Sequence, residues 1–144
     1  MLLYDAQTRL ATAQAFSASG ASTDYFDTSK ARNLGDGGPL VMVFTVTTAL
    51  AGTTPTAAFS IEADSSTTFG TKVTLSSVTP ASAGLTVGSR VVVPLPPGLI
   101  SQFVRGYVTL GGTTPTISVN IDILPAAMFA KPNPPGYASG FAIK

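Results

Sequence analysis

Gly52-Thr53-Thr54-Pro55-Thr56 and Gly112-Thr113-Thr114-Pro115-Thr116 are two copies of one motif, placed sixty residues apart. Each copy leads into a segment, 57–62 or 117–122, in which apolar and polar residues alternate with the period of a β-strand. Proline cannot donate to a central ladder, so we expect each motif to be a polar turn that joins two strands. The sequence therefore predicts two similar β-hairpins. The alternative is that the motif recurs only because turns draw on few residue types.

The alternation also predicts which side chains are buried. One face of each segment carries only apolar residues, and the other carries polar ones. We expect burial of Ala57, Phe59, Ile61, Ala63, Ile117, Val119, Ile121 and Ile123, and exposure to water of Ser60, Glu62, Asn120 and Asp122.

The low charge of the chain is the most informative feature of its composition. Only 10% of the 144 residues are charged, against about 25% in an average soluble protein. A small domain with so few charges has little to prevent association, which favours a protein that works in contact with other proteins. The net charge is +1 and no cluster of Lys and Arg is present. We therefore expect no nucleic-acid partner and no membrane partner.

The sequence predicts no enzyme and no cofactor. It contains no His and no Cys, which removes the usual general base, the thiolate nucleophile and the commonest metal ligands. Glu62 and Asp64 share a strand face, and Asp122 occupies the position of Glu62 in the second copy. If the hairpins lie side by side, these carboxylates could form a cation site or an acid pair. The favoured interpretation is that they are solvated.

The N-terminus shows no signal peptide, and the longest apolar run, 40–44, is too short to span a bilayer. We therefore expect a soluble, mature chain.

The order of segments predicts one all-β domain between two arms. Residues 1–22 are assigned to an N-terminal arm, with a short helix or a weak edge strand over 11–19 as alternatives. Residues 23–124 are assigned to a single antiparallel β-sandwich of jelly-roll type with about eight short strands. Strands are expected at 23–27, 40–48, 57–64, 73–78, 89–95, 103–110 and 117–124, and the weak edge strand over 11–19 would be the eighth.

Residues 125–144 form the predicted C-terminal arm. The stretch 131–136 holds three prolines and cannot join a sheet or a helix. Apolar side chains nevertheless surround it, so we expect this arm to dock either on its own sandwich or on a neighbouring subunit.

Short polar motifs in the first forty residues carry a family resemblance. In order, they are Asp5-Ala6-Gln7, Ala13-Gln14-Ala15, Ser22-Thr23, Asp27, Ala31-Arg32-Asn33-Leu34-Gly35-Asp36-Gly37 and Pro39-Leu40. This run resembles the start of the cement, or decoration, proteins of tailed bacteriophages, typified by that of a Bordetella podovirus. Beyond residue 45 the resemblance extends only to alternating strands and the spacing of turns.

The resemblance implies a structural virion protein without an active site. It implies a jelly-roll subunit that forms a homodimer. It also implies synthesis in the cytoplasm of the bacterial host and binding to the outer surface of the capsid, where major capsid proteins meet. Loop chemistry and unburied apolar side chains single out two contact segments, 32–40 and 131–141, and also Phe129. The candidate contact residues are Arg32, Leu34, Asp36, Pro39, Leu40, Phe129, Pro132, Pro134, Pro135, Tyr137 and Phe141.

Two other functions remain open at this point. A jelly roll could bind carbohydrate or a receptor, with Tyr4, Tyr25, Tyr107 or Tyr137 stacked on a sugar ring. The second alternative is a shell subunit that assembles with itself, without any partner.

Overall fold

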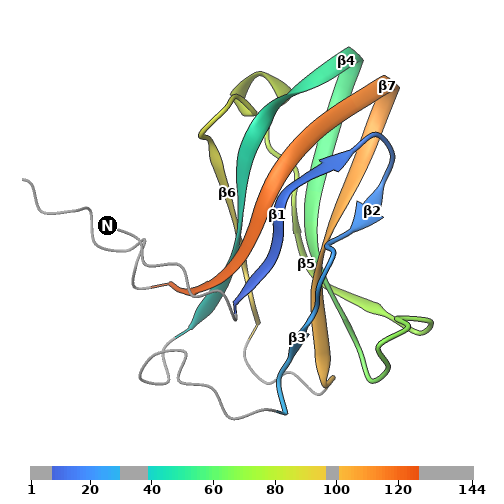
Figure 1. The fold of residues 1–144 in the computed structure, drawn as a ribbon, viewed down its shortest axis with the longest axis vertical. Helices are drawn as coiled ribbons and strands as arrows, with labels where there is room; N and C mark the ends of the chain where they lie inside the picture. The colour runs from blue at the N-terminus through green and yellow to red at the C-terminus, as the bar shows by residue number, and fades with distance from the viewer. Residues whose placement is uncertain (1–7, 30–38, 97–100, 127–144) are drawn as a thin grey trace, which may run out of the picture.

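The computed structural model describes residues 8–29, 39–96 and 101–126. Within these residues the regular structure is extended, apart from one 3-10 turn, η1 (Ser82–Gly84). The all-β class predicted from the alternation is confirmed. Seven strands form one antiparallel sheet (Figure 1): β1 (Arg9–Phe16), β2 (Gly20–Ala21), β3 (Phe26–Asp27), β4 (Leu40–Asp64), β5 (Val73–Val78), β6 (Arg90–Pro94) and β7 (Phe103–Pro125).

Two long strands organise the molecule. β4 has 25 residues, β7 has 23, and they pair antiparallel from Leu40 opposite Pro125 to Asp64 opposite Phe103. The two Gly-Thr-Thr-Pro-Thr motifs lie at the middle of this ribbon, where Thr53 faces Thr113. Both strands bend there, so that each contributes one half to each of two layers (Figure 1).

The prediction that each motif closes a β-hairpin was wrong. The two halves of β4 pair with β7 and not with each other, and the same holds for β7. The positive φ angles of Gly52 (132°) and Thr54 (46°) bend the strand, and Gly112 (99°) and Thr114 (48°) repeat this conformation. The ladder register also shifts at the motifs. Proline is tolerated at such an interruption, which the sequence pattern alone does not distinguish from a hairpin loop.

Each motif glycine lies against the backbone of the other motif. A Cβ atom on Gly112 would lie 2.5 Å from the Thr54 carbonyl oxygen and 2.8 Å from that of Thr53. A Cβ atom on Gly52 would lie 2.9 Å from the Thr114 oxygen and 3.0 Å from that of Thr113. The bent strands therefore cross at a distance that only glycine permits, and the close contact is reciprocal between the two motifs.

The first layer of the folded ribbon has four strand segments, and the second has five, of which β2 and β3 lie along one edge. The first layer has the order β1, second half of β7, first half of β4, β6. The second has β2 with β3, first half of β7, second half of β4, β5. This order is compatible with the predicted jelly roll. Along one side the Ser76 hydroxyl joins the layers by donating to the Pro94 carbonyl oxygen over 2.6 Å.

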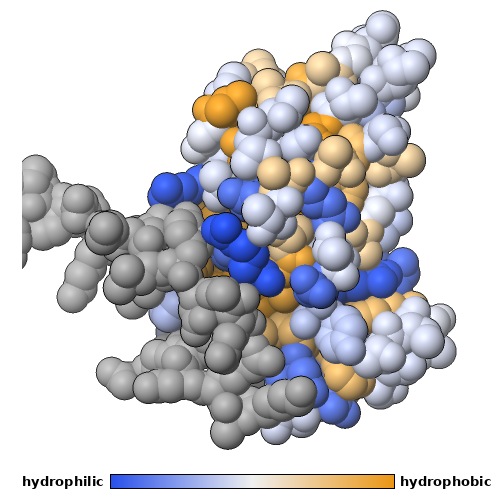
Figure 2. Space-filling view, in the orientation of Figure 1, coloured by the Kyte–Doolittle hydropathy of each residue, from blue (hydrophilic) through white to orange (hydrophobic). Residues whose placement is uncertain are grey.

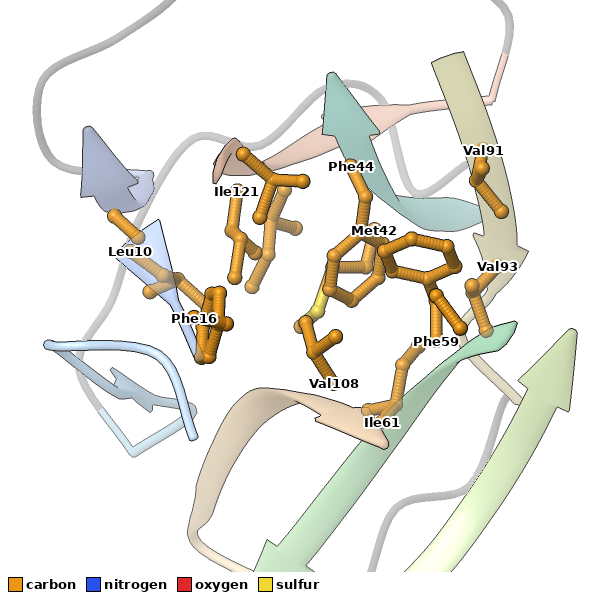
Figure 3. Close-up of a cluster of buried hydrophobic side chains, with 14 of the residues drawn as sticks. Leu10, Phe16, Met42, Phe44, Phe59, Ile61, Val91, Val93, Val108 and Ile121 are labelled. Atoms are coloured by element: carbon orange, nitrogen blue, oxygen red, sulfur yellow. The ribbon is translucent and has the colours of Figure 1, made fainter. Parts of the chain in front are cut away.

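The core fills the space between the layers. All eight side chains that the alternation placed inward are at most 1% exposed, which confirms that prediction. The rings of Phe44 and Phe59, from the two halves of β4, have centroids 5.0 Å apart. Leu10 and Phe16 of β1 complete the cluster (Figure 3). The apolar faces of one folded ribbon thus close on each other.

Residues 9–16, which were assigned to the N-terminal arm, form strand β1 within the sandwich. β1 pairs with β7, with Phe16 opposite Ile117. The weak edge strand that we considered as the alternative is therefore present, although it covers 9–16 and not 11–19. Its alanines, Thr12 and Gln14 gave little sign of burial, because the contacts that hold β1 come from only a few larger side chains.

Replacing Gly112 with alanine should strongly destabilise the fold. The new Cβ would meet the Thr53 and Thr54 carbonyl oxygens at a φ angle that L-residues rarely adopt, so we expect a loss of about 2–4 kcal/mol. Gly52→Ala should behave similarly. Urea denaturation would measure the loss. Gly84→Ala is the matched control, because no atom lies within 4 Å of its Cβ position, and an unchanged Gly112→Ala midpoint would contradict the crossing geometry.

Candidate interaction surface

The structure places only two of the predicted contact residues. Pro39 is exposed, and Leu40, the first residue of β4, is half-buried. The other nine lie outside the described residues: Arg32, Leu34, Asp36, Phe129, Pro132, Pro134, Pro135, Tyr137 and Phe141. Their contacts stay a prediction.

The described chain shows where both predicted contact segments begin. The backbone N–H of Ala126 donates to the Pro39 carbonyl oxygen over 2.8 Å, and Leu40 faces Pro125 across the ladder. Segments 30–38 and 127–144 are therefore attached at neighbouring points on the sandwich. The sequence did not indicate this proximity, because the two points lie more than eighty residues apart.

The other described residues next to undescribed segments lie at the same end of the molecule. The Ile123 N–H donates to the Thr8 carbonyl oxygen (3.0 Å) and the Leu95 N–H to that of Leu40 (3.0 Å). The N–H of Thr28 likewise bonds to the carbonyl of Gln102 over 2.8 Å. We call this the terminal end: it lies opposite the bends of β4 and β7 (Figure 1), and it is bounded by Thr8, Ser29, Pro39, Pro96, Ser101 and Ala126.

A second apolar cluster lies on the outer face of the first layer at the terminal end. Val41, Val43 and Leu124 are 7%, 0% and 2% exposed, and Ala126 packs against them. These side chains point away from the main core, since Met42 and Phe44 between them point inward. Both faces of β4 are therefore covered at its start.

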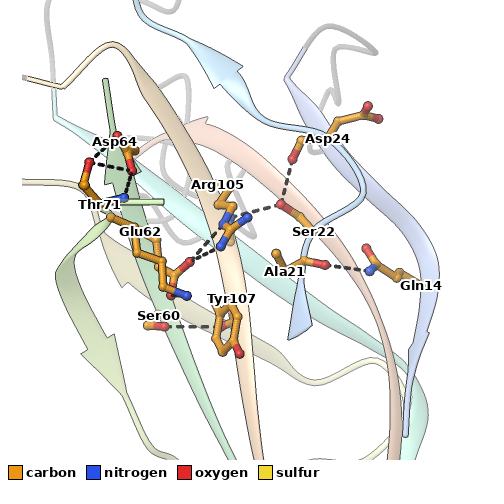
Figure 4. A network of polar contacts seen from close by, with 12 residues as sticks. Gln14, Ala21, Ser22, Asp24, Ser60, Glu62, Asp64, Thr71, Arg105 and Tyr107 are labelled. Atoms are coloured by element: carbon orange, nitrogen blue, oxygen red, sulfur yellow. Dashed lines mark hydrogen bonds and ion pairs between the residues drawn. The ribbon is translucent and has the colours of Figure 1, made fainter. Parts of the chain in front are cut away.

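The prediction that Ser60 and Glu62 face water was wrong. Ser60 is 7% exposed, and its hydroxyl donates to the Tyr107 carbonyl oxygen over 3.4 Å. Glu62 is 4% exposed, and its carboxylate binds the Arg105 guanidinium (2.8 Å) and the Lys72 ammonium (3.2 Å). Arg105 lies directly opposite Glu62 in the ladder (Figure 4), and its guanidinium stacks 4.1 Å from the centre of the Phe69 ring. A carboxylate on an outer face is buried here because the 65–72 loop folds over it.

Asp64 holds that loop in place. Its carboxylate accepts hydrogen bonds from the N–H groups of Ser66 (3.0 Å) and Thr71 (2.7 Å) and from the Thr71 hydroxyl. Burial acts to raise the pKa of Asp64, but these hydrogen bonds outweigh it and hold the pKa below the ordinary 3.8. Asp64 is thus a structural carboxylate that stays ionised at neutral pH.

Asp122 was also predicted to face water, and it is 1% exposed. Its carboxylate accepts from the Arg9 Nε over 2.8 Å. Burial raises the pKa of Asp122, and the hydrogen bond and charge of Arg9 oppose the rise without cancelling it. The positive charge of Arg9 therefore compensates the negative charge of the buried Asp122 carboxylate, which belongs to the second copy of the repeat.

The structure does not bring the carboxylates together as a catalytic or cation site. Glu62 belongs to the second layer and Asp122 to the first, and each faces outward with its own cation. No group of three or more acidic, His or Cys side chains that could hold a metal occurs among the described residues. Within the same residues, no helix has the length and apolarity needed to cross a membrane.

Of the tyrosines proposed to stack on a sugar, two lie among the described residues. Tyr25 is 45% exposed and meets the Phe103 ring edge-on at 5.2 Å. Tyr107 lies 4.8 Å below the Lys72 ammonium. Tyr4 and Tyr137 lie outside the described part of the chain. The two described rings do not form a shared platform in the contacts that the structure shows.

Two polar residues in the N-terminal motifs, Gln14 and Ser22, tie strands together, a role that the sequence did not indicate. The Gln14 amide donates to the Ala21 carbonyl oxygen and accepts from the Thr23 N–H, both over 2.8 Å (Figure 4). The hydroxyl of Ser22 accepts from the Gly106 N–H over 3.1 Å. The available signal was a polar residue, such as Gln14, among small ones. The sequence does not show its partners, because they lie outside its own strand.

Replacing Arg9 with alanine should destabilise the protein in a pH-dependent way. The variant leaves the Asp122 carboxylate buried without its cation, so we expect a loss of about 1.5–3 kcal/mol at pH 7. The folded-state pKa of Asp122 is already raised, and without Arg9 it would rise further. The loss of stability should therefore grow as the pH rises from the folded-state pKa of the wild type to that of the variant, and it should shrink near about pH 3, where Asp122 is protonated in both proteins. Denaturation of wild type and variant across this range measures it; in an Asp122→Asn background the pH dependence should vanish, and a pH-independent loss in both backgrounds would argue against the assigned pair.

A comparison with protein families finds a match that begins within β1 and ends within β7. The family model Bbp16 matches residues 10–123, which span most of the chain from β1 to β7. Bbp16 is a family of Bordetella phage proteins. A search of curated proteins gives no match. The matched range includes the contact segment 32–40 and excludes residues 129–141. Because the match covers well over half of the sequence, the chain belongs to the Bbp16 family.

Proposed function

We propose that this protein is a capsid cement protein, a structural component that binds the outside of a tailed-phage head and stabilises contacts between major capsid proteins. Three observations support the proposal: membership of a phage protein family, an all-β sandwich, and a composition with only 10% charged residues. The similarity of the N-terminal motifs to cement proteins gives it its specific form.

The observation that carries the proposal is that the chain leads to the two predicted contact segments from neighbouring points at the terminal end. Those points are Pro39 and Ala126, which are hydrogen-bonded to each other. Two segments on one rigid body can engage a shell together, and binding of the first raises the effective concentration of the second. This arrangement suits a subunit that must hold on to neighbouring capsid proteins at once.

The partners follow from the same proposal. The major capsid protein is the primary partner, a second copy of the chain completes a homodimer, and the protein resides on the outer capsid surface after synthesis in the host cytoplasm. We assign no catalytic role, since the sequence has no His or Cys and Glu62, Asp64 and Asp122 each have a structural partner.

Deleting residues 129–144 should abolish binding to heads. Cosedimentation of the purified chain with expanded heads that lack it measures binding, and cryo-electron microscopy of the pellet should show ordered density at equivalent joints. The sandwich ends at Pro125, so the truncated chain should still unfold cooperatively. Full binding by a folded truncated chain would remove the C-terminal arm from the interface.

Heads that carry the protein should survive heating better than heads that lack it. The reason is that each bound subunit adds contacts across a joint that must open when the shell fails. DNA release measured against temperature tests this expectation, with added purified protein as the rescue control. Equal survival of both kinds of head would contradict a stabilising role.

A further inference from the structure

Among the described residues, those at the end of the sandwich opposite the terminal end include no charged residue. This end consists of the bends of β4 and β7, the loop that carries η1, and the turn after β1, and these segments contain only Ala, Gly, Ser, Thr, Pro, Leu and Val. We call it the charge-free end. It comprises residues 17–19, 48–56, 79–88 and 109–116.

Hydrogen bonds and the glycine crossing fasten these segments together. The Ser82 hydroxyl donates to the Pro55 carbonyl oxygen over 2.6 Å, and the Leu50 N–H bonds to the Leu85 oxygen over 3.1 Å. The Leu110 N–H donates to the Ser19 hydroxyl over 2.9 Å. The charge-free end is therefore one continuous, preorganised surface.

The charges of the described residues lie elsewhere. Figure 2 shows strongly hydrophilic residues in a band across the middle and below, while the upper part, where β4 and β7 bend, shows only weakly polar and apolar ones. Val87, within the charge-free end, is 68% exposed. The charged residues of the described chain are Arg9, Asp24, Asp27, Glu62, Asp64, Lys72, Arg90, Arg105 and Asp122.

The chemistry of this surface restricts its partner. Phosphates and acidic lipids require Lys or Arg, which the surface lacks. Sugars are usually stacked on exposed aromatic rings, and none of these segments contains one. A charged protein surface would lose hydration without gaining a counter-charge. An uncharged protein surface, in contrast, can bind without that cost.

The side chains of the charge-free end are also suited to docking. Ala, Ser, Thr and Val lose little rotamer entropy when they are covered, whereas the long side chains of Lys and Glu lose much more. Most surfaces of soluble proteins carry such charges to prevent association. Their complete absence from one end is therefore expected of a surface that is covered in the working state.

We propose that the charge-free end is a docking surface for an uncharged surface of the capsid shell. The inference rests on the proposed cement function and extends it, because it gives the subunit a second contact at the end opposite the two arm segments. A body held at both ends can span a joint between two capsid proteins, and each contact strengthens the other. Binding through this end is insensitive to salt.

Two exposed valines provide a matched test. Val87 lies in the charge-free end and Val73 in the part that carries charges, beside Lys72, and they are 68% and 59% exposed. We would measure cosedimentation with heads that lack the protein, for wild type and the variants Val87→Glu, Val87→Lys, Val73→Glu and Val73→Lys. Circular dichroism and thermal unfolding would confirm that each variant is folded.

The expected result is that both Val87 variants bind at least about tenfold more weakly, because either charge is desolvated without a partner, while the Val73 variants bind like wild type. Unchanged binding of the Val87 variants beside a binding wild type would overturn the inference and leave the cement function standing. A wild type that does not bind heads would overturn both.

Sedimentation velocity of the free proteins tests the other possible occupant of the charge-free end, a second copy of the chain. If the Val87 variants lower self-association but bind heads normally, the charge-free end holds a second copy of the chain, and the assignment to the shell is overturned. If self-association is the same in all variants while only the Val87 variants lose head binding, the shell assignment is supported.

Discussion

The fold depends on the close crossing of two bent strands. At the crossing, Gly52 and Gly112 each lie against the carbonyl groups of the other motif, and this approach lets one two-stranded ribbon fold over itself. The apolar faces of its two halves then meet, as the contact between Phe44 and Phe59 shows. Most other strands add to the edges of a core that the ribbon alone defines.

Much of this fold follows from the sequence, and what does not follow has a physical reason. Alternation fixes the inward face of a strand whichever partner it takes, so the buried set from Ala57 to Ile123 was predicted correctly. Alternation does not say which strand is the partner, and the hairpins were therefore wrong. Nor does it report what folds over an outer face: Glu62 is covered by the loop that Asp64 organises, and that loop shows no hydrophobic period.

The candidate contact residues were less predictable than the fold. Loop composition selected 32–40 and 131–141, but their neighbouring attachment points arise from the pairing of the ends of β4 and β7. The charge-free end was overlooked because its residues come from four separate stretches, none of them unusual alone. Only the bend of the ribbon gathers them on one surface, whereas the low overall charge was already visible in the composition.

The two ends of the sandwich differ in the kind of recognition they can supply. A surface of small neutral side chains binds at low entropic cost, but it distinguishes poorly between partners because it presents no charge to be matched. Specificity must then come from other contacts, and the terminal end has the chemistry for them, with the apolar cluster of Val41 and Val43 close to the Arg9 and Asp122 pair. For a subunit that must recognise one joint and then add strength to it, such a division permits each end to be adapted without weakening the crossing that joins them.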